Sequence, residues 1–372
     1  LAVCGFCWGI VTICMLFVKS YGSLLALRLL LGLFEGGYFP CLAVMVSMFY
    51  KPEEQGLRLA IVLSFAALAG AFGGLISYAL VQVKSDNYYL QGYRLIYLVE
   101  GLITILAVPL VFFFVPDSPQ QCRFLNEKEK KIMAIRTKQR EAYMGNDKFE
   151  WKEIVKAFSD PRIVLSPIIQ FCSDVVLYGF LTFLPTILKS GLGFDNNQAQ
   201  YLTIPVYVTS LVAILVLSIL SDRFQLRSPF LLGVSAVGII GYILLLAVSN
   251  NAVKYFATYL VSIPLFLNAG INIAWTTGNS MPHYRRTALM GTNQTIGNIA
   301  GVVAGQVYRT LPYRLGHGFS LGCLVVLCIA TVLNVAFLKH QNRVKQQILN
   351  GEREDTKLER TGDHALDFKY KY

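Results

Sequence analysis

The chain has 372 residues, of which 55% are hydrophobic and 15% are charged. Soluble domains usually carry about 25% charged residues, so this composition excludes an ordinary soluble domain and indicates a membrane protein. The formal net charge of +11 would suit a nucleic-acid partner, and its distribution along the chain decides between that reading and membrane topology.

Apolar runs of membrane-spanning length follow one another along the chain. A spanning helix needs about 20 mostly apolar residues. Four runs precede residue 116 and six follow residue 161, so the sequence predicts an all-α polytopic membrane protein with ten spans. The runs cover residues 1–18, 23–49, 58–83, 94–115, 162–188, 199–221, 228–249, 254–278, 287–308 and 318–338.

Basic residues gather on one predicted side of the membrane. That side comprises the loops 50–57, 116–161, 222–227 and 279–286 and the tail from Lys339, with the helix-end residues Arg58 and Arg162. It holds 25 of the 33 Lys and Arg residues, which is the bias of cytoplasmic segments. We therefore expect both chain ends in the cytoplasm, with a lipid bilayer and no nucleic acid as partner.

The spacing of the runs predicts four regions. Residues 1–115 form an incomplete N-terminal bundle of four helices, 116–161 a cytoplasmic linker, 162–338 a C-terminal six-helix bundle and 339–372 a cytoplasmic tail. Transporters made of two six-helix bundles joined by a long loop fit this pattern if two helices precede Leu1. The chain would then contain ten of twelve transmembrane helices.

Small residues at every fourth position support two related halves. They are Ala66, Gly70 and Gly74 in the third run and Gly297, Gly301 and Gly305 in the ninth run. This spacing lets helix backbones approach closely. With two helices missing, the two stripes occupy the same position in each half.

Charged residues inside the spans are the candidates for ion coupling. Arg28 and Glu35 lie two helical turns apart on one face of the second run, and Asp174 lies near mid-depth in the fifth. A carboxylate at this depth can bind a proton when its site is dry and release it when the site is hydrated or paired. The alternative is a structural Arg–Glu network that holds helices in register.

A polar and aromatic stripe supplies candidate solute contacts. Asn268, Asn272 and Trp275 stand at i, i+4 and i+7 in the eighth run, where amides can orient a polar solute and an indole can stack on it. Further candidates are Tyr38, Tyr178, which is four residues after Asp174, and Asn293. Such stripes also serve only to join helices, and that alternative stays open.

The sequence does not indicate catalytic chemistry. The eight cysteines lie mainly within spans, and the four histidines lie in loops, at span ends or in the tail. No metal-ligand spacing or nucleophile–base pair stands out. We therefore expect neither an enzyme nor a metal or cofactor, with the proton as the coupling ion.

Two stretches resemble transporters of the major facilitator superfamily. The stretch from Arg28 to Pro40 resembles their fourth helix, and its Arg-x-x-x-Gly-x-x-Glu-Gly form resembles the anion:cation symporter branch. Asp222-Arg223 with Arg227 resembles the signature loop between helices 8 and 9. The resemblance implies that these three residues lock the cytoplasmic gate.

Further strings resemble the fungal allantoate permease family. They are Pro116-Asp117-Ser118-Pro119 with Arg123-Phe124-Leu125, Phe183-Leu184-Pro185-Thr186-Ile187, Leu220-Ser221-Asp222-Arg223 and Tyr313-Arg314-Leu315-Gly316-His317. The resemblance implies a monomer in the plasma membrane that takes up a small carboxylate-bearing solute, such as allantoate, nicotinate, pantothenate or biotin, together with protons. It also implies that the first two helices are missing here. The alternative is a truncated, non-transporting or nutrient-sensing membrane protein.

Overall fold

The computed structural model describes residues 1–50, 55–81, 83, 93–116, 122, 124–144, 162–281, 283–355 and 362–372. Helices make up the regular secondary structure of these residues, and their order follows the expected apolar runs. The chain divides into a first unit, Leu1–Lys51 with Phe72–Lys138, and a second unit, Pro52–Ala71 with Gln139–Tyr372.

The first unit is assembled around a close contact between α1 (Ala2–Cys14) and α5 (Tyr93–Phe114). At Gly9 a Cβ atom would lie 2.7 Å from the Ile105 side chain and 3.3 Å from the Gly101 carbonyl oxygen. Only glycine allows the two backbones to approach this closely.

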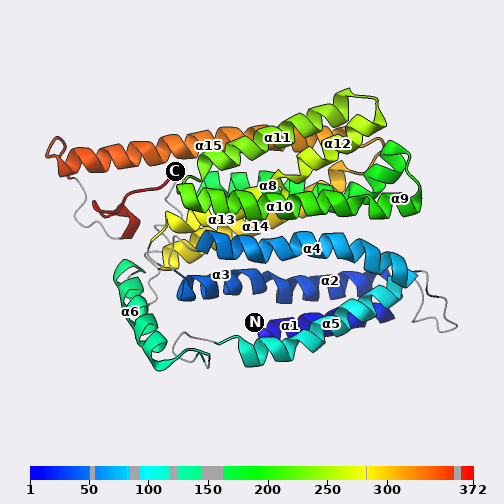
Figure 1. The fold of residues 1–372 in the computed structure, drawn as a ribbon, viewed down its shortest axis with the longest axis horizontal. Coiled ribbons are helices and arrows are strands. Elements are labelled where there is room, and N and C mark those ends of the chain that lie inside the picture. The colour runs from blue at the N-terminus through cyan, green and yellow to red at the C-terminus, as the bar shows by residue number, and fades with distance from the viewer. Residues whose placement is uncertain are drawn as a thin grey trace. The chain divides into compact units, whose positions relative to one another are not determined.

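The expected run 23–49 is two consecutive helices, α2 (Tyr21–Gly36) and α3 (Tyr38–Phe49), separated at Gly37 (Figure 1). Ser20 caps α2, since its hydroxyl accepts from the Ser23 backbone N–H at 3.2 Å. Two glycines and then Pro40, which has no backbone N–H, interrupt the hydrogen-bond ladder at the break. The interruption lies two residues after Glu35.

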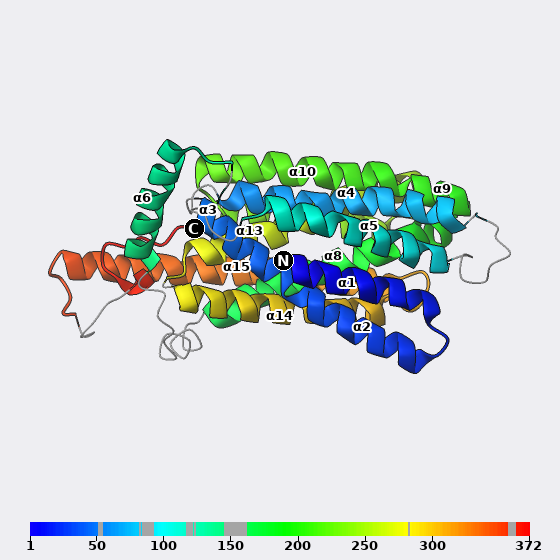
Figure 2. The same cartoon turned by 90° about the horizontal axis from the view of Figure 1, so that it is seen from below.

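The second unit is a helical bundle in which α8 contacts both α14 and α15 extensively. Figures 1 and 2 show its long helices from two directions. The expected run 254–278 is again divided, because Pro264 begins a new helix. The helices are α8 (Arg162–Thr186), which continues as a π-helical turn (Ile187–Gly191), α9 (Asn196–Tyr201), α10 (Thr203–Phe224), α11 (Ser228–Ala247), α12 (Asn251–Ser262), α13 (Pro264–Gly278), α14 (His283–Val307) and α15 (Arg314–Leu349).

Six helical stretches of the described chain are long and apolar enough to cross a membrane. They are Tyr93–Phe114, Arg162–Gly191, Gln198–Phe224, Ser228–Ala247, Asn251–Gly278 and Arg314–Leu349. Shorter apolar helices cover Ala2–Phe17 and Leu57–Gly70, the second within α4 (Gln55–Val81). The larger number of ten spans stays a prediction.

The last helix and the central loop differ in detail from the expectation. The run expected to end at residue 338 continues as α15 to Leu349, because residues 339–349 are polar but good helix formers. The loop contains a helix, α6 (Glu127–Met144), and the Asn126 backbone N–H donates to Glu129 Oε2 at 2.8 Å at its start. Residues 117–121, 123 and 145–161 of the linker lie outside the described residues.

Candidate functional site

A row of polar residues runs along α8 at every fourth position. Its members are Arg162, Ser166, Gln170, Asp174 and Tyr178. At 3.6 residues per turn, neighbours in this row lie on nearly the same face of the helix. The first four are buried, with no more than 3% of their surface exposed, so the row points into the bundle.

Asp174 is the buried carboxylate of this row. Its two oxygens each accept a hydrogen bond from Gln170 Nε2, both at 3.1 Å. Within the described part of the chain, no cationic side chain forms an ion pair with Asp174. An amide is therefore its side-chain partner, and the carboxylate is not charge-compensated there.

The α8–α14 contact at this level depends on Gly297. A Cβ atom there would lie 2.5 Å from Asp174 Oδ2 and 2.7 Å from Gln170 Cγ. Gly301, one turn later, faces the Tyr178 ring, whereas Gly305 faces open space. Two of the three small residues predicted from spacing therefore meet α8; in α4, the surroundings of Gly74 lie outside the description.

Asn272 and Asn293 join α13 and α14 to the row on α8. Asn272 Nδ2 donates to Gln170 Oε1 at 3.0 Å and to the Ser166 carbonyl at 3.1 Å. Asn293 Oδ1 accepts from Ser166 Oγ at 3.0 Å, and its Nδ2 donates to Gln170 Oε1 at 3.3 Å. The Thr276 hydroxyl is hydrogen-bonded to that of Ser166.

We call Ser166, Gln170, Asp174, Asn272, Thr276 and Asn293 the polar cluster. Buried polar groups are costly unless they bond one another, and a closed network of this kind fixes the positions of its helices. If the network opened, its amides would be available to a polar or anionic solute and its carboxylate to a proton. The described residues contain no group of three or more His, Cys, Asp or Glu that could hold a metal ion.

The predicted stripe on α13 does not converge on this cluster. Asn268 Nδ2 donates to Ser235 Oγ of α11 at 3.0 Å, and Trp275 Nε1 donates to the Lys371 carbonyl at 2.9 Å. The three positions span about 10 Å of helix rise, so each meets a different neighbour. Only Asn272 reaches the polar cluster.

Tyr178 extends the row on α8 beyond the cluster. Its hydroxyl donates to Asn298 Oδ1 at 2.8 Å. Tyr178 is half-buried, and this hydrogen bond is exposed. Asp174 and Tyr178 therefore share a helix face, as their spacing predicts, but have different partners.

The candidate residues of the first unit are more exposed. Arg28 Nη2 donates to Tyr97 Oη at 3.3 Å, and Tyr38 packs edge-on against Trp8 with ring centroids 6.1 Å apart. Glu35 is exposed and has no hydrogen bond or ion pair with another described residue. The described contacts of Arg28 and Glu35 include no ion pair between the two, although the sequence places them on one helix face.

The three expected gate residues differ in exposure and in their contacts. Asp222 forms an ion pair with Arg227, whose Nη1 also donates to Ser221 Oγ at 3.1 Å, whereas Arg223 is exposed. The turn is closed by Gln225, which ends α10 in the left-handed conformation with φ 54° and ψ 27°. Gln225 Nε2 donates to the Asp222 carbonyl at 2.7 Å, which compensates for a non-glycine residue there.

Three residues of the polar cluster, Ser166, Gln170 and Thr276, were not predicted from the sequence. They are neutral, whereas Asp174 stands out as a charge within an apolar run. The signal was nevertheless present, because Ser166, Gln170, Asp174 and Tyr178 repeat every fourth residue.

Membrane-length helices that enclose a hydrogen-bonded polar cluster define a polytopic membrane protein with a polar interior. The sequence profile of the Major Facilitator Superfamily matches residues 1–305. The chain belongs to this superfamily, and it is a membrane transporter by family and by relatives.

Two relatives place the chain among fungal transporters. It is 49% identical to the Schizosaccharomyces pombe "Uncharacterized transporter C1683.12", over 98% of this chain and 75% of that protein. It is 32% identical to the "High-affinity nicotinic acid transporter" of Saccharomyces cerevisiae, over 100% of this chain and 70% of that protein. These relatives are transporters rather than enzymes.

Solved structures support the fold. A proton:xylose symporter superposes with a TM-score of 0.70 at 14% sequence identity, over 90% of this chain and 78% of that one. A human organic anion transporter gives a TM-score of 0.62 at 13% identity, over 89% and 76%. At this identity the likeness concerns the fold alone.

Proposed function

We propose that the protein is a proton-coupled symporter of a small organic anion that works by alternating access. The observation that carries this proposal is the buried Asp174 within a cluster of neutral amides and hydroxyls. The 32% identity to a nicotinic acid transporter supports a carboxylate-bearing solute. We further propose that the protein belongs to the fungal allantoate permease family. It would then lie in the plasma membrane with both chain ends in the cytoplasm.

In this proposal the polar cluster is the coupling element of the second unit. When the cluster is closed, the Asp174 carboxylate is hydrogen-bonded to Gln170 and lies against Gly297 of α14. When the bundle opens to one side of the membrane, water reaches the carboxylate and its proton occupancy changes. The amides released from one another then become available to the solute carboxylate.

The first unit contributes Glu35 as a second proton-binding carboxylate and Arg28 as a cation near the solute path, by resemblance to the symporter branch. Tyr38, Tyr178, Asn268, Asn272, Trp275 and Asn293 remain proposed solute contacts. The contacts above favour Asn272 and Asn293 among these. Trp275 and Asn268 serve other contacts in this conformation.

The test is transport by the full-length protein in liposomes. Uptake of labelled nicotinate is measured with and without an inward proton gradient, and allantoate, pantothenate and biotin serve as unlabelled competitors. We expect uptake that depends on the gradient and is reduced by at least one of these carboxylates. Solute binding without net flux would instead favour a sensing role, and gradient-independent flux would remove the proton from the mechanism.

A further inference from the structure

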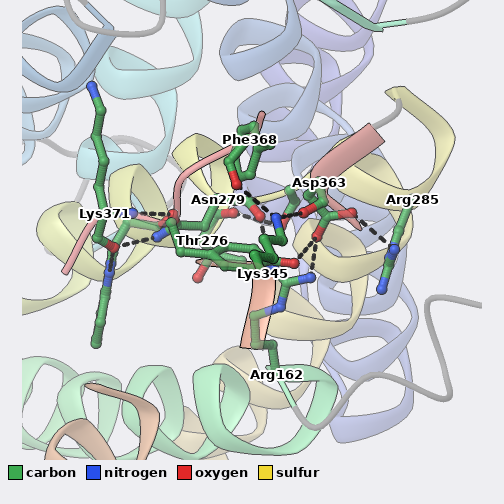
Figure 3. Close-up of polar contacts among 11 residues, drawn as sticks. Arg162, Thr276, Asn279, Arg285, Lys345, Asp363, Phe368 and Lys371 are labelled. Carbon is green, nitrogen blue, oxygen red and sulfur yellow. Dashed lines mark hydrogen bonds and ion pairs between the residues drawn. The ribbon is translucent and has the colours of Figure 1, made fainter. Parts of the chain in front are cut away.

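Residues 362–372, which we call the C-terminal segment, fold back onto the helix ends of the second unit (Figure 3). Asp363 is completely buried, at 0% exposure. Its Oδ1 accepts from Arg285 Nη1 at 2.9 Å, and its Oδ2 is paired with Arg162 Nη2. One carboxylate therefore joins the first residue of α8 to the first turn of α14.

A third cation holds the backbone of the same segment. Lys345 of α15 is 4% exposed, and its Nζ donates to the carbonyl of Asp363 at 2.7 Å and to that of Phe368 at 2.6 Å. The ammonium group also lies 4.3 Å from the centroid of the Tyr370 ring. Burying a cation is costly, and these contacts compensate for it.

The end of the segment is bonded to α13 and α15 through its backbone. The Tyr370 N–H donates to Asn342 Oδ1 at 2.9 Å, and the Lys371 N–H donates to Asn279 Oδ1 at 2.8 Å. The Lys371 carbonyl accepts from Trp275 Nε1 at 2.9 Å and from Asn279 Nδ2 at 2.8 Å. The segment thus has both side-chain and main-chain attachment sites.

The attachment points on α8, α13 and α14 belong to the helices that build the polar cluster. Arg162 is one turn before Ser166 on α8, and Trp275 is one turn after Asn272 on α13. Arg285 precedes Asn293 by two turns on α14. The segment therefore fixes one end of each of the three helices whose polar residues must separate for the cluster to open.

We propose that Arg162 and Arg285 form a carboxylate-binding site that Asp363 occupies from within the chain, so that the C-terminal segment is an autoinhibitory latch. Two guanidinium groups, each bonded to one carboxylate oxygen, are chemically suited to any carboxylate. A carboxylate-bearing solute on this side of the bundle competes with Asp363 for them. The inhibitory effect rests on the proposed transport function, whereas the docking of the segment does not.

The first experiment compares Asp363→Asn with Asp367→Asn in the full-length protein. Asp367 lies in the same segment but is exposed, and no described contact involves it, so it is a matched control. Hydrogen exchange reports docking, because the Tyr370 and Lys371 amides are bonded only when the segment is in place. We expect their protection to fall about tenfold or more in Asp363→Asn, and to be unchanged in Asp367→Asn.

Transport is measured on the same two variants. We expect Asp363→Asn to raise the initial uptake rate severalfold and Asp367→Asn to leave it unchanged. If Asp363→Asn releases the segment without raising the rate, the latch is not inhibitory. If the two amides are unprotected in the parent protein, the segment is not docked at all.

A second experiment covers the case in which Asp363→Asn does not fold. The protein lacking residues 356–372 is mixed with a labelled peptide of residues 362–372, and with the same peptide carrying Asn at position 363. We expect only the Asp363 peptide to bind and to lower transport. Equal binding of both peptides would exclude the arginine site, and this readout remains valid even if no carboxylate is transported.

Discussion

The second unit buries two carboxylates in opposite ways. Asp174 is 3% exposed and bonded to the Gln170 amide, whereas Asp363 is 0% exposed and paired with Arg162 and Arg285. A carboxylate with neutral partners can change its protonation state without leaving buried cations unpaired. A carboxylate between two arginines joins the helices that carry them through two ion pairs. The first arrangement suits a proton-binding group. The second suits a structural contact that holds the C-terminal segment in place until the whole segment is released.

Among the variants considered, Asp174→Asn should change transport the most. The substitution preserves the size of the side chain and removes the ionisable group, so proton-driven uptake should fall by about 100-fold or more, as expected for an essential acid–base group. Solute exchange between two equal pools should persist, because it needs no net proton movement. Unchanged gradient-driven uptake would show that Asp174 does not couple.

Gly297→Ala should disturb the Asp174 environment without touching its charge. The added methyl group would lie 2.5 Å from Asp174 Oδ2, so either the Asp174 side chain or α14 must shift, at a cost of about 1–3 kcal/mol for overpacking. Thermal unfolding in detergent measures this as a lower Tm. Gly305→Ala is the control on the same helix, since nothing lies within 4 Å of a Cβ there; equal losses in both variants would exclude the packing argument.

Trp275→Phe should weaken the docking of the C-terminal segment, but less than Asp363→Asn does. It removes one hydrogen bond, from Nε1 to the Lys371 carbonyl, worth about 0.5–1.5 kcal/mol. Hydrogen exchange of the Tyr370 and Lys371 amides should therefore rise by up to about tenfold. Trp8→Phe, a tryptophan of the first unit, should leave these amides as protected as in the parent protein.

The smallest effect is expected at Tyr97→Phe. The bond from Arg28 Nη2 to Tyr97 Oη is 3.3 Å long and Arg28 is exposed, so its loss should change stability by less than about 1 kcal/mol. A change in Tm as large as that of Gly297→Ala would mean that Arg28 has a structural role that its exposure does not indicate.

The sequence predicted the helices well because apolar runs directly reflect the requirement for burial or lipid contact. It missed the breaks at Gly37 and Pro264, since hydropathy continues across them while the hydrogen-bond ladder does not. It also ended the last helix near residue 338, where hydrophobicity falls, although the helix itself continues to Leu349. Hydropathy and helix propensity are separate properties, and at residue 338 only hydropathy falls.

The candidate site was predictable only in part. Asp174 was found because a charge in an apolar run is rare and costly. The partners of the stripe on α13 could not be predicted, since equal spacing along one helix does not determine which neighbour each position meets. The Arg162–Asp363 pair was beyond sequence reasoning, because its members are 201 residues apart and no local pattern marks such a contact.

The fourfold spacing on α8 has a consequence for how this helix can move. Four residues turn an α-helix by about 400°, so each polar residue is offset from the previous one by about 40° and about 6 Å. From Arg162 to Tyr178 the row therefore winds about 160° around the helix over about 24 Å. The row is therefore a slowly winding stripe that runs nearly along the helix axis. A rotation of α8 by about 40° with a slide of about 6 Å would place each polar side chain where the next one now lies.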